Sequence, residues 1–130
     1  MQQIRNAVMG RYSLLPFWYT LFYEASVTGA PTMRPLWFEY PQDAETFDMD
    51  DQWLVGSDIL VKPVTAPGVS STDIYLPGNS PWYDVDTFEP FIGPKLVSIA
   101  TPLDKIAALQ VIVTSWFVTT ISMILKVQWC

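Results

Sequence analysis

Eleven prolines, spread along a chain of 130 residues, constrain this sequence more than any other feature. Proline has no backbone N–H and its ring clashes with the preceding helical turn, so it is largely confined to turns, first turns of helices and strand ends. The prolines therefore argue against an all-helical bundle and favour many short strands joined by turns. The length fits one modest domain and is well short of the roughly 250 residues that a complete α/β barrel needs.

Composition excludes several classes of function. Half of the residues are hydrophobic and 15% are aromatic, so the chain should fold rather than remain disordered. Its formal charge is −6, and seven of the thirteen acids lie between Glu39 and Asp58, which makes nucleic acid an unsuitable partner. Without histidine, catalysis by serine or cysteine paired with histidine is excluded, and acid–base chemistry would fall to carboxylates. The single cysteine, Cys130, cannot form a disulfide within the chain.

Residues 2–27 are predicted to be helical, because apolar residues recur there every three or four positions. Pro16 should kink this helix or restart it as a first-turn residue, and Gly29 followed by Pro31 should end it. Aromatic residues make the remaining faces apolar as well. The helix therefore needs covering on nearly every side.

After Pro31 the pattern changes to short apolar segments separated by proline and glycine turn residues. The predicted strands are Met33 to Tyr40, Trp53 to Val55, Ile59 to Val64, Asp73 to Leu76, Trp82 to Val85 and Leu96 to Ala100. This spacing is typical of an antiparallel sandwich, so residues 31 to about 105 are interpreted as part of an all-β domain.

The segment from Ile106 to Leu125 is twenty residues without a charge, which is the length of a membrane-spanning helix. It is rich in Val, Ile and Thr and contains Gln110, so it would insert less favourably than a run of leucines. Two interpretations stay open: a membrane anchor, or translated non-coding sequence that is apolar by accident. The composition favours the second.

Five blocks of sequence follow one another in an order that is characteristic of one enzyme family. They are Arg11 to Ala25; Gly29 to Trp37 with Glu39-Tyr40-Pro41; Asp50-Asp51-Gln52 with Gly56, Ile59 to Val61 and Pro63-Val64; Ile74 to Gly78 with Trp82-Tyr83-Asp84; and Thr101 to Ile106. Together they resemble glycoside hydrolase family 31, over about residues 2 to 106.

The resemblance implies an α+β fragment in three parts. Residues 1–30 would be the last helix of the catalytic (β/α)8 TIM barrel, and residues 31–106 a partial C-terminal domain, an incomplete antiparallel β-sandwich. Residues 107–130 would be a divergent apolar tail with the length of a transmembrane helix.

The family also implies a retaining α-glucosidase, in which one aspartate attacks the anomeric carbon and a second acts as acid and base. Both belong to motifs that precede the helix, and neither motif is present here, so no residue is assigned a catalytic, cofactor-binding or metal-binding role. The resemblance implies that the parent enzyme hydrolyses terminal α-linked glucose on N-glycans in the endoplasmic reticulum. It implies a regulatory β subunit as partner and no metal or organic cofactor. The chain alone is expected to be inactive.

The chain departs from the family at Ser26, where histidine is usual, and after Ile106, where an arginine- and glycine-rich continuation is expected. The tail therefore indicates an alternative exon, a retained intron or a truncated gene model. Residues 1–10 contain no apolar run before a small-residue cleavage site, so no signal peptide is expected. The competing hypothesis is a non-catalytic isoform, tethered to a membrane or bound to the regulatory subunit.

Two charged features have both a catalytic and a structural interpretation. The cluster Asp48-Met49-Asp50-Asp51 superficially resembles the family's nucleophile motif. Adjacent aspartates in an extended strand point to opposite faces, however, so a role in a turn or strand start is favoured. Arg34 stands in an apolar setting, where arginine needs a carboxylate or carbonyl partner. An ion pair that ties the β-domain to the barrel is favoured over contact with substrate.

The aromatic rows Phe17-Trp18-Tyr19 and Phe22-Tyr23 offer flat faces on which sugars could stack, but their helical spacing favours packing. Trp82 and Tyr83 are better candidates for a surface contact. A cross-strand pair in a hairpin explains them equally well.

Overall fold

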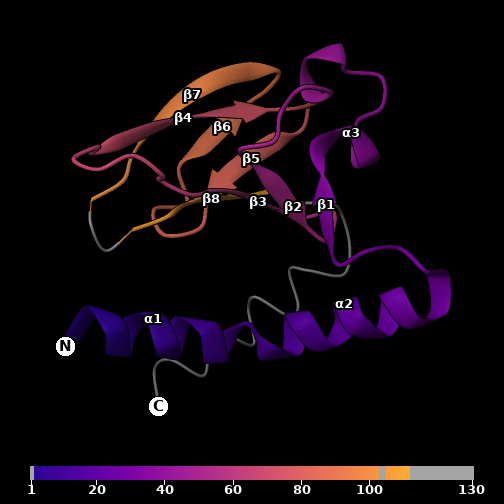
Figure 1. Cartoon of the computed structure of the whole chain (residues 1–130), viewed down its shortest axis with the longest axis horizontal. Helices are drawn as coiled ribbons and strands as arrows, with labels where there is room; N and C mark the ends of the chain where they lie inside the picture. Colours follow the sequence, from indigo (N-terminus) through magenta and orange to yellow (C-terminus); the bar gives the residue numbers. More distant parts are fainter. Residues whose placement is uncertain (1, 103–104, 112–130) are drawn as a thin grey trace. The chain divides into compact units, whose positions relative to one another are not determined.

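The computed structural model describes residues 2–102 and 105–111. These residues fall into two compact units, a helical unit up to Thr32 and a β-unit that begins at Met33 (Figure 1). Each unit has the secondary structure that its hydrophobic spacing indicates, with a helical period before Pro31 and short punctuated segments after it. The described part of the chain is therefore an α+β structure.

The helical unit contains α1 (Gln2–Ser13) and α2 (Leu15–Thr28). Pro16 lies in the first turn of α2, where a missing N–H costs no intrahelical bond, so it restarts the helix as predicted. Gly29 ends α2 in the left-handed conformation, with φ of 76°, and its N–H donates to the Ala25 carbonyl. The predicted stop signal is confirmed, because glycine adopts this conformation without a Cβ clash.

The β-unit contains two antiparallel sheets. The larger has the order β1-β2-β3-β8-β5-β6, and the smaller pairs β4 with β7. The strands of the larger sheet are β1 (Met33–Pro35), β2 (Trp53–Val55), β3 (Ile59–Lys62), β5 (Pro81–Asp84), β6 (Pro90–Ile92) and β8 (Ala107–Val111). The smaller sheet consists of β4 (Ser71–Leu76) and β7 (Lys95–Ala100). The predicted antiparallel β-domain is therefore present.

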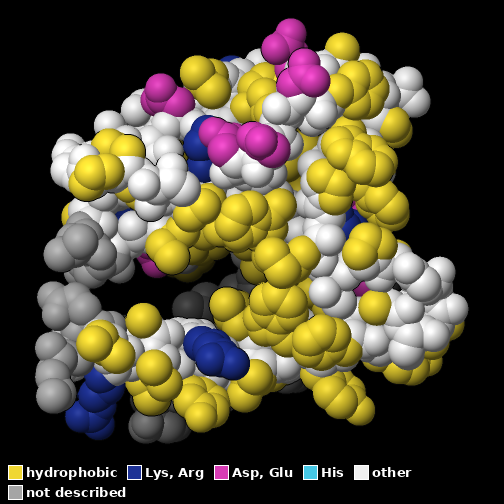
Figure 2. Space-filling view, in the orientation of Figure 1, with side chains coloured by type: hydrophobic (Ala, Val, Ile, Leu, Met, Phe, Trp, Pro, Cys, Tyr) yellow, Lys and Arg dark blue, Asp and Glu magenta, His cyan; other side chains and the backbone are white. Residues whose placement is uncertain are grey.

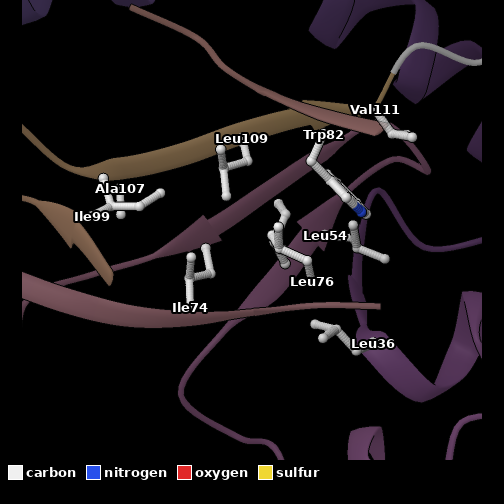
Figure 3. Close-up of a cluster of buried hydrophobic side chains, with 10 residues drawn as sticks. Leu36, Leu54, Ile74, Leu76, Trp82, Ile99, Ala107, Leu109 and Val111 are labelled. Atoms are coloured by element: carbon white, nitrogen blue, oxygen red, sulfur yellow. The ribbon is translucent and has the colours of Figure 1, made fainter. Parts of the chain in front are cut away.

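The core of the β-unit lies between its two sheets. Ile74 and Leu76 of β4 face Trp82 and Leu109 of the larger sheet, and all four side chains are fully buried (Figure 3). The cluster is completed by Leu36, Leu54, Leu60, Ile99, Ala107 and Val111. Burial of a large aliphatic or aromatic side chain contributes about 1.5–3 kcal/mol, so this cluster is the main source of stability for the unit.

The segment after β1 differs from the prediction. Met33 to Tyr40 was expected to be one strand, but β1 ends at Pro35 and a short helix, α3 (Leu36–Glu39), follows it. A 3-10 helix, η1 (Ala44–Thr46), then precedes β2. Leu36 is fully buried while Trp37 and Phe38 are exposed, a burial pattern that a helical turn produces and an alternating strand does not. The change from strand to helix could not be predicted, because the sequence is apolar on both sides of it.

Strand β8 occupies the centre of the larger sheet, between β3 and β5. Leu109 lies opposite Leu60 on one side and Asp84 on the other. Ala107, Leu109 and Val111 point into the core, whereas the residues between them are half-buried. The prediction that residues 107–111 belong to the apolar tail is wrong, because their alternate side chains complete the core of the sheet.

The rest of the predicted tail, residues 112–130, lies outside the described residues. Among those that are described, no helix has both the length and the apolar character needed to cross a membrane. A membrane span that begins at Ile106 is wrong, because residues 107–111 form a core strand. Whether residues 112–125 insert into a membrane stays a prediction.

Candidate functional site

Arg34 of β1 forms an ion pair with Glu39 at the end of α3. The two side chains are only 11% and 26% exposed. The Arg34 guanidinium also lies 5.6 Å from the centre of the Phe38 ring, within range of a cation–π contact. The ion pair predicted for Arg34 was one that ties the β-domain to the barrel, whereas both members of this pair belong to the β-unit.

A second carboxylate, Asp58, lies in the turn between β2 and β3 near this ion pair. Burial raises the pKa of Asp58; the Ser57 hydroxyl and Arg34 oppose that rise, while Glu39 adds to it. The Asp58 carbonyl accepts the backbone N–H of Val111 at 2.9 Å. This turn is therefore attached to the end of β8.

The acidic cluster at residues 48–51 lies at the surface, just before β2. Asp48, Asp50 and Asp51 are all exposed. Asp51 makes an ion pair of 2.6 Å with Lys62 of β3, just before β2 begins. The favoured interpretation, a strand-start role, agrees with this contact.

The aromatic rows of the helical unit differ in exposure. Phe17 is buried, whereas Tyr19, Phe22 and Tyr23 are 78%, 59% and 66% exposed. Trp18 stacks obliquely on Phe22, with 5.9 Å between ring centres. Most of the large side chains in these rows are thus not packed within the described residues.

Trp82 is not a surface residue, which excludes the surface contact considered for it. Its side chain is fully buried, and its indole N–H donates to the Pro77 carbonyl at 3.1 Å. Trp82 lies opposite Phe91 of β6 and Val111 of β8, as a cross-strand interpretation expects. Tyr83 is half-buried on the opposite face of β5.

Sequence reasoning missed a depression on the β-unit. It has a volume of about 420 Å³ and is lined by residues 39–45 together with Tyr75, Gly78 and Pro94. Residues 39–45 contribute the end of α3 and most of η1, whereas Tyr75 comes from β4. Segments far apart in the chain meet here, so spacing along the sequence gave no signal for the site.

A hydrogen-bond network fixes Tyr75 in this depression. Its hydroxyl donates to Asp43 Oδ2 at 2.8 Å. The buried Gln52 side chain accepts the Tyr75 N–H at 3.0 Å and donates to the Tyr75 carbonyl at 2.9 Å. Burial, reinforced by the hydrogen bond to Asp43, raises the pKa of Tyr75 to about 12. The Tyr75 hydroxyl is therefore a protonated donor across the physiological pH range.

Three of the chain's carboxylates are engaged in ion pairs within the β-unit. Retaining hydrolysis needs two carboxyl groups about 5 Å apart across a sugar. Glu39, Asp51 and Asp84 are each in an ion pair with an arginine or lysine. Within residues 2–102 and 105–111, no three histidine, cysteine or acidic side chains are grouped so as to hold a metal ion. The absence of catalytic residues from the chain stays a prediction.

Comparison with known proteins finds a consistent similarity. Residues 29–111 match the model of the glycosyl hydrolase family 31 C-terminal domain. The chain is 50% identical over 110 residues to neutral alpha-glucosidase AB of Dictyostelium discoideum, and 49% identical over 108 residues to human neutral alpha-glucosidase C. Each match covers 82% of this chain but only 12% of the relative.

Solved structures give the same result. A family 31 alpha-xylosidase from a soil metagenome, complexed with xylose, superposes with a TM-score of 0.85 at 30% identity, over 92% of this chain and 18% of that one. A Flavobacterium johnsoniae dextranase complexed with glucose superposes with a TM-score of 0.81 at 36% identity, over 85% of this chain and 14% of that one. The chain thus corresponds to less than a fifth of each of these proteins.

Proposed function

The chain belongs to glycosyl hydrolase family 31, and from this membership we propose that it forms the C-terminal β-domain of an α-glucosidase whose catalytic barrel lies outside it. The observation that carries the proposal is the identity of about one half to neutral α-glucosidases, over 82% of the chain. The match of residues 29–111 to the family's C-terminal domain supports the proposal that this chain is that part of the enzyme.

The helical unit supports this assignment, and we propose that α1 and α2 are the last helical segment of the missing barrel. Apolar and aromatic side chains lie along both helices (Figure 2). Ile4, Tyr19 and Val27 are 71%, 78% and 67% exposed, which is unusual for large apolar groups on a free surface. Docking against the barrel would remove this apolar area from water.

For the whole enzyme we propose hydrolysis of terminal α-linked glucose, with N-glycans as substrate, a regulatory β subunit as partner and the endoplasmic reticulum as location. The names of the relatives support the α-glucosidase activity. The N-glycan substrate, the partner and the location rest on the resemblance of the sequence blocks. The partner and the location are tested by affinity purification of the chain from cell fractions, followed by a test for the regulatory subunit.

A chimaera tests the proposal directly. The 110-residue segment of the Dictyostelium relative that matches this chain is replaced by the chain's own segment, and turnover of a chromogenic α-glucoside is measured. We expect an active enzyme, because a β-domain of the same family should support the same barrel. Asp51→Asn should leave turnover unchanged, since Asp51 is an exposed side chain whose ion pair is with Lys62. A soluble, folded chimaera without turnover would contradict the proposal.

A further inference from the structure

The depression lined by residues 39–45, Tyr75, Gly78 and Pro94 has features of a ligand site. Its volume of about 420 Å³ lies within the range of roughly 300–1,000 Å³ that is typical of small-molecule sites. The lining combines two tyrosines and two prolines with three carboxylates and one amide side chain, and it contains no basic residue. Apolar rings interspersed with hydrogen-bonding groups suit a ligand that has both an apolar face and hydroxyl groups.

The two tyrosine rings are held in place before any ligand arrives. Tyr40 and Tyr75 both pack partly against the core of the β-unit. Tyr40 also covers Gly78, where a Cβ would lie 2.9 Å from its Cε1 atom and where φ is 70°. Only glycine fits this close approach and this backbone conformation. A ligand would therefore meet fixed rings and would not have to order them, which favours binding.

The polar groups are arranged to bind a neutral ligand. Asp43 accepts the Tyr75 hydroxyl through Oδ2 and the Glu45 N–H through Oδ1, at 2.8 and 3.2 Å. A carboxylate has about four acceptor positions, so roughly two remain for hydroxyl donors. Glu39 is already neutralised by Arg34. The negative charge is thus partly engaged within the protein, which favours hydroxyl groups over a cation as the occupant.

We propose that this depression binds an α-glucoside, with a sugar ring against Tyr40 and its hydroxyl groups donating to Asp43. A pyranose ring offers an apolar face to an aromatic ring and hydroxyl groups to carboxylate and amide side chains. The choice of glucose over other sugars rests on the proposed function. The binding site itself rests on the geometry of the depression, and no carboxyl group there needs to react with the sugar.

The experiment uses the full 130-residue chain immobilised on a biosensor surface, because immobilisation prevents association between copies. The probe is glycogen, with maltose as a competitor. We expect saturable glycogen binding that maltose abolishes. Asp43→Asn should weaken it about tenfold, the effect of losing one charge-assisted hydrogen bond. Asparagine still caps η1, so this variant should remain folded.

The matched control is Asp73→Asn, which makes the same change of charge at an exposed position on β4, two residues from Tyr75. It should bind glycogen as the wild type does. Tyr40→Ala, if circular dichroism shows it to be folded, should lose binding. Absence of glycogen binding by folded wild-type chain would overturn the proposal, as would equal weakening by Asp43→Asn and Asp73→Asn. Binding of polylysine in place of glycogen would overturn it in favour of a cationic ligand.

The two proposals can fail independently. An active chimaera, together with a folded chain that does not bind glycogen, would remove the binding site and leave the proposed function intact. Glycogen binding that depends on Asp43, together with a folded but inactive chimaera, would remove the proposed function and leave the binding site intact.

Discussion

The contact between Asp84 and Lys105 offers a quantitative test of the place of β8 in the fold. Asp84 ends β5, and Lys105 lies two residues before β8. Lys105 Nζ lies 2.9 Å from Asp84 Oδ2 and 3.2 Å from Oδ1. Asp84 Oδ1 also accepts the backbone N–H groups of Asp86 and Thr87, each at 2.9 Å. The pair therefore joins the end of one core strand to the start of its neighbour.

The magnitude follows from burial. The Asp84 and Lys105 side chains are 4% and 18% exposed, so solvent screens their contact only weakly. A hydrogen bond to a charged group is worth about 1.5–3 kcal/mol, and Lys105 retains Asp86 at 3.5 Å when Asp84 is changed. We therefore expect Asp84→Asn to lower the free energy of unfolding by about 2 kcal/mol. Asp84→Ala should cost about 3 kcal/mol, because the two backbone N–H groups also lose their acceptor.

The assay is urea unfolding of the dilute chain, followed by tryptophan fluorescence, in a double-mutant cycle of Asp84→Asn with Lys105→Met. The coupling energy should be about 1–2 kcal/mol. Asp51→Asn is the control, since Asp51 is 56% exposed, against 4% for Asp84, and its pair with Lys62 should be worth less than about 1 kcal/mol. A coupling energy near zero, or equal costs for Asp51→Asn and Asp84→Asn, would show that the Asp84–Lys105 contact does not hold β8 in place.

Three further predictions follow from burial, charge and sequence. Burial alone would raise the pKa of Asp84, but its hydrogen bonds to Thr87, Lys105 and Asp86 outweigh that and lower it. The Asp84 carboxylate should therefore stabilise the fold fully above about pH 4, and this stabilisation should be lost as the pH falls through the folded-state pKa. The urea midpoints of wild type and Asp84→Asn should then differ less in acid than at neutral pH. Residues 33–111 should sediment as a monomer while the full chain associates through its exposed helices; a monodisperse full chain would count against this. If the tail is an anchor, deletion of residues 112–130, which spares β8, should release the chain from carbonate-washed membranes, whereas a wild-type chain in the soluble fraction excludes an anchor.

Much of the fold could be predicted from local signals. The restart at Pro16 and the stop at Gly29 follow from the backbone restrictions of these two residues, and both are confirmed. The strand Trp53 to Val55 was predicted with its observed bounds, because turn residues close it on both sides. The ends of these helices and of this strand are set by residues next to them in the sequence, so the sequence alone is enough to predict them.

Elements whose conformation depends on distant partners could not be predicted. Strand β8 is uncharged and adjoins a longer apolar run, so its sequence alone resembles a membrane span. Only its pairing with Leu60 of β3 and Trp82 of β5 makes it a core strand. Strand β6 (Pro90–Ile92) was likewise missed, because it begins with proline and is only three residues long.

In the candidate site, too, only the features set by nearby residues could be predicted. That Arg34 needs a partner was expected from its apolar surroundings, but its pairing with Glu39, within the β-unit, was not. The depression at Tyr75 was not expected, since its Asp43 and Gln52 contacts span 32 and 23 residues. Periodicity along β4 places Tyr75 on the outer face but does not identify what lies beside it.

We infer that this chain is the β-domain of an α-glucosidase and contains no catalytic group of its own. The decisive measurement is turnover of a chromogenic α-glucoside by the purified full chain, alongside the chimaera and the variants Asp50→Asn and Asp51→Asn. We expect no turnover above background from the chain alone, and loss of even one catalytic carboxylate commonly costs several orders of magnitude. The chimaera should be active with or without either substitution. Activity of the isolated chain that Asp50→Asn or Asp51→Asn abolishes would contradict the account and place catalysis within these residues.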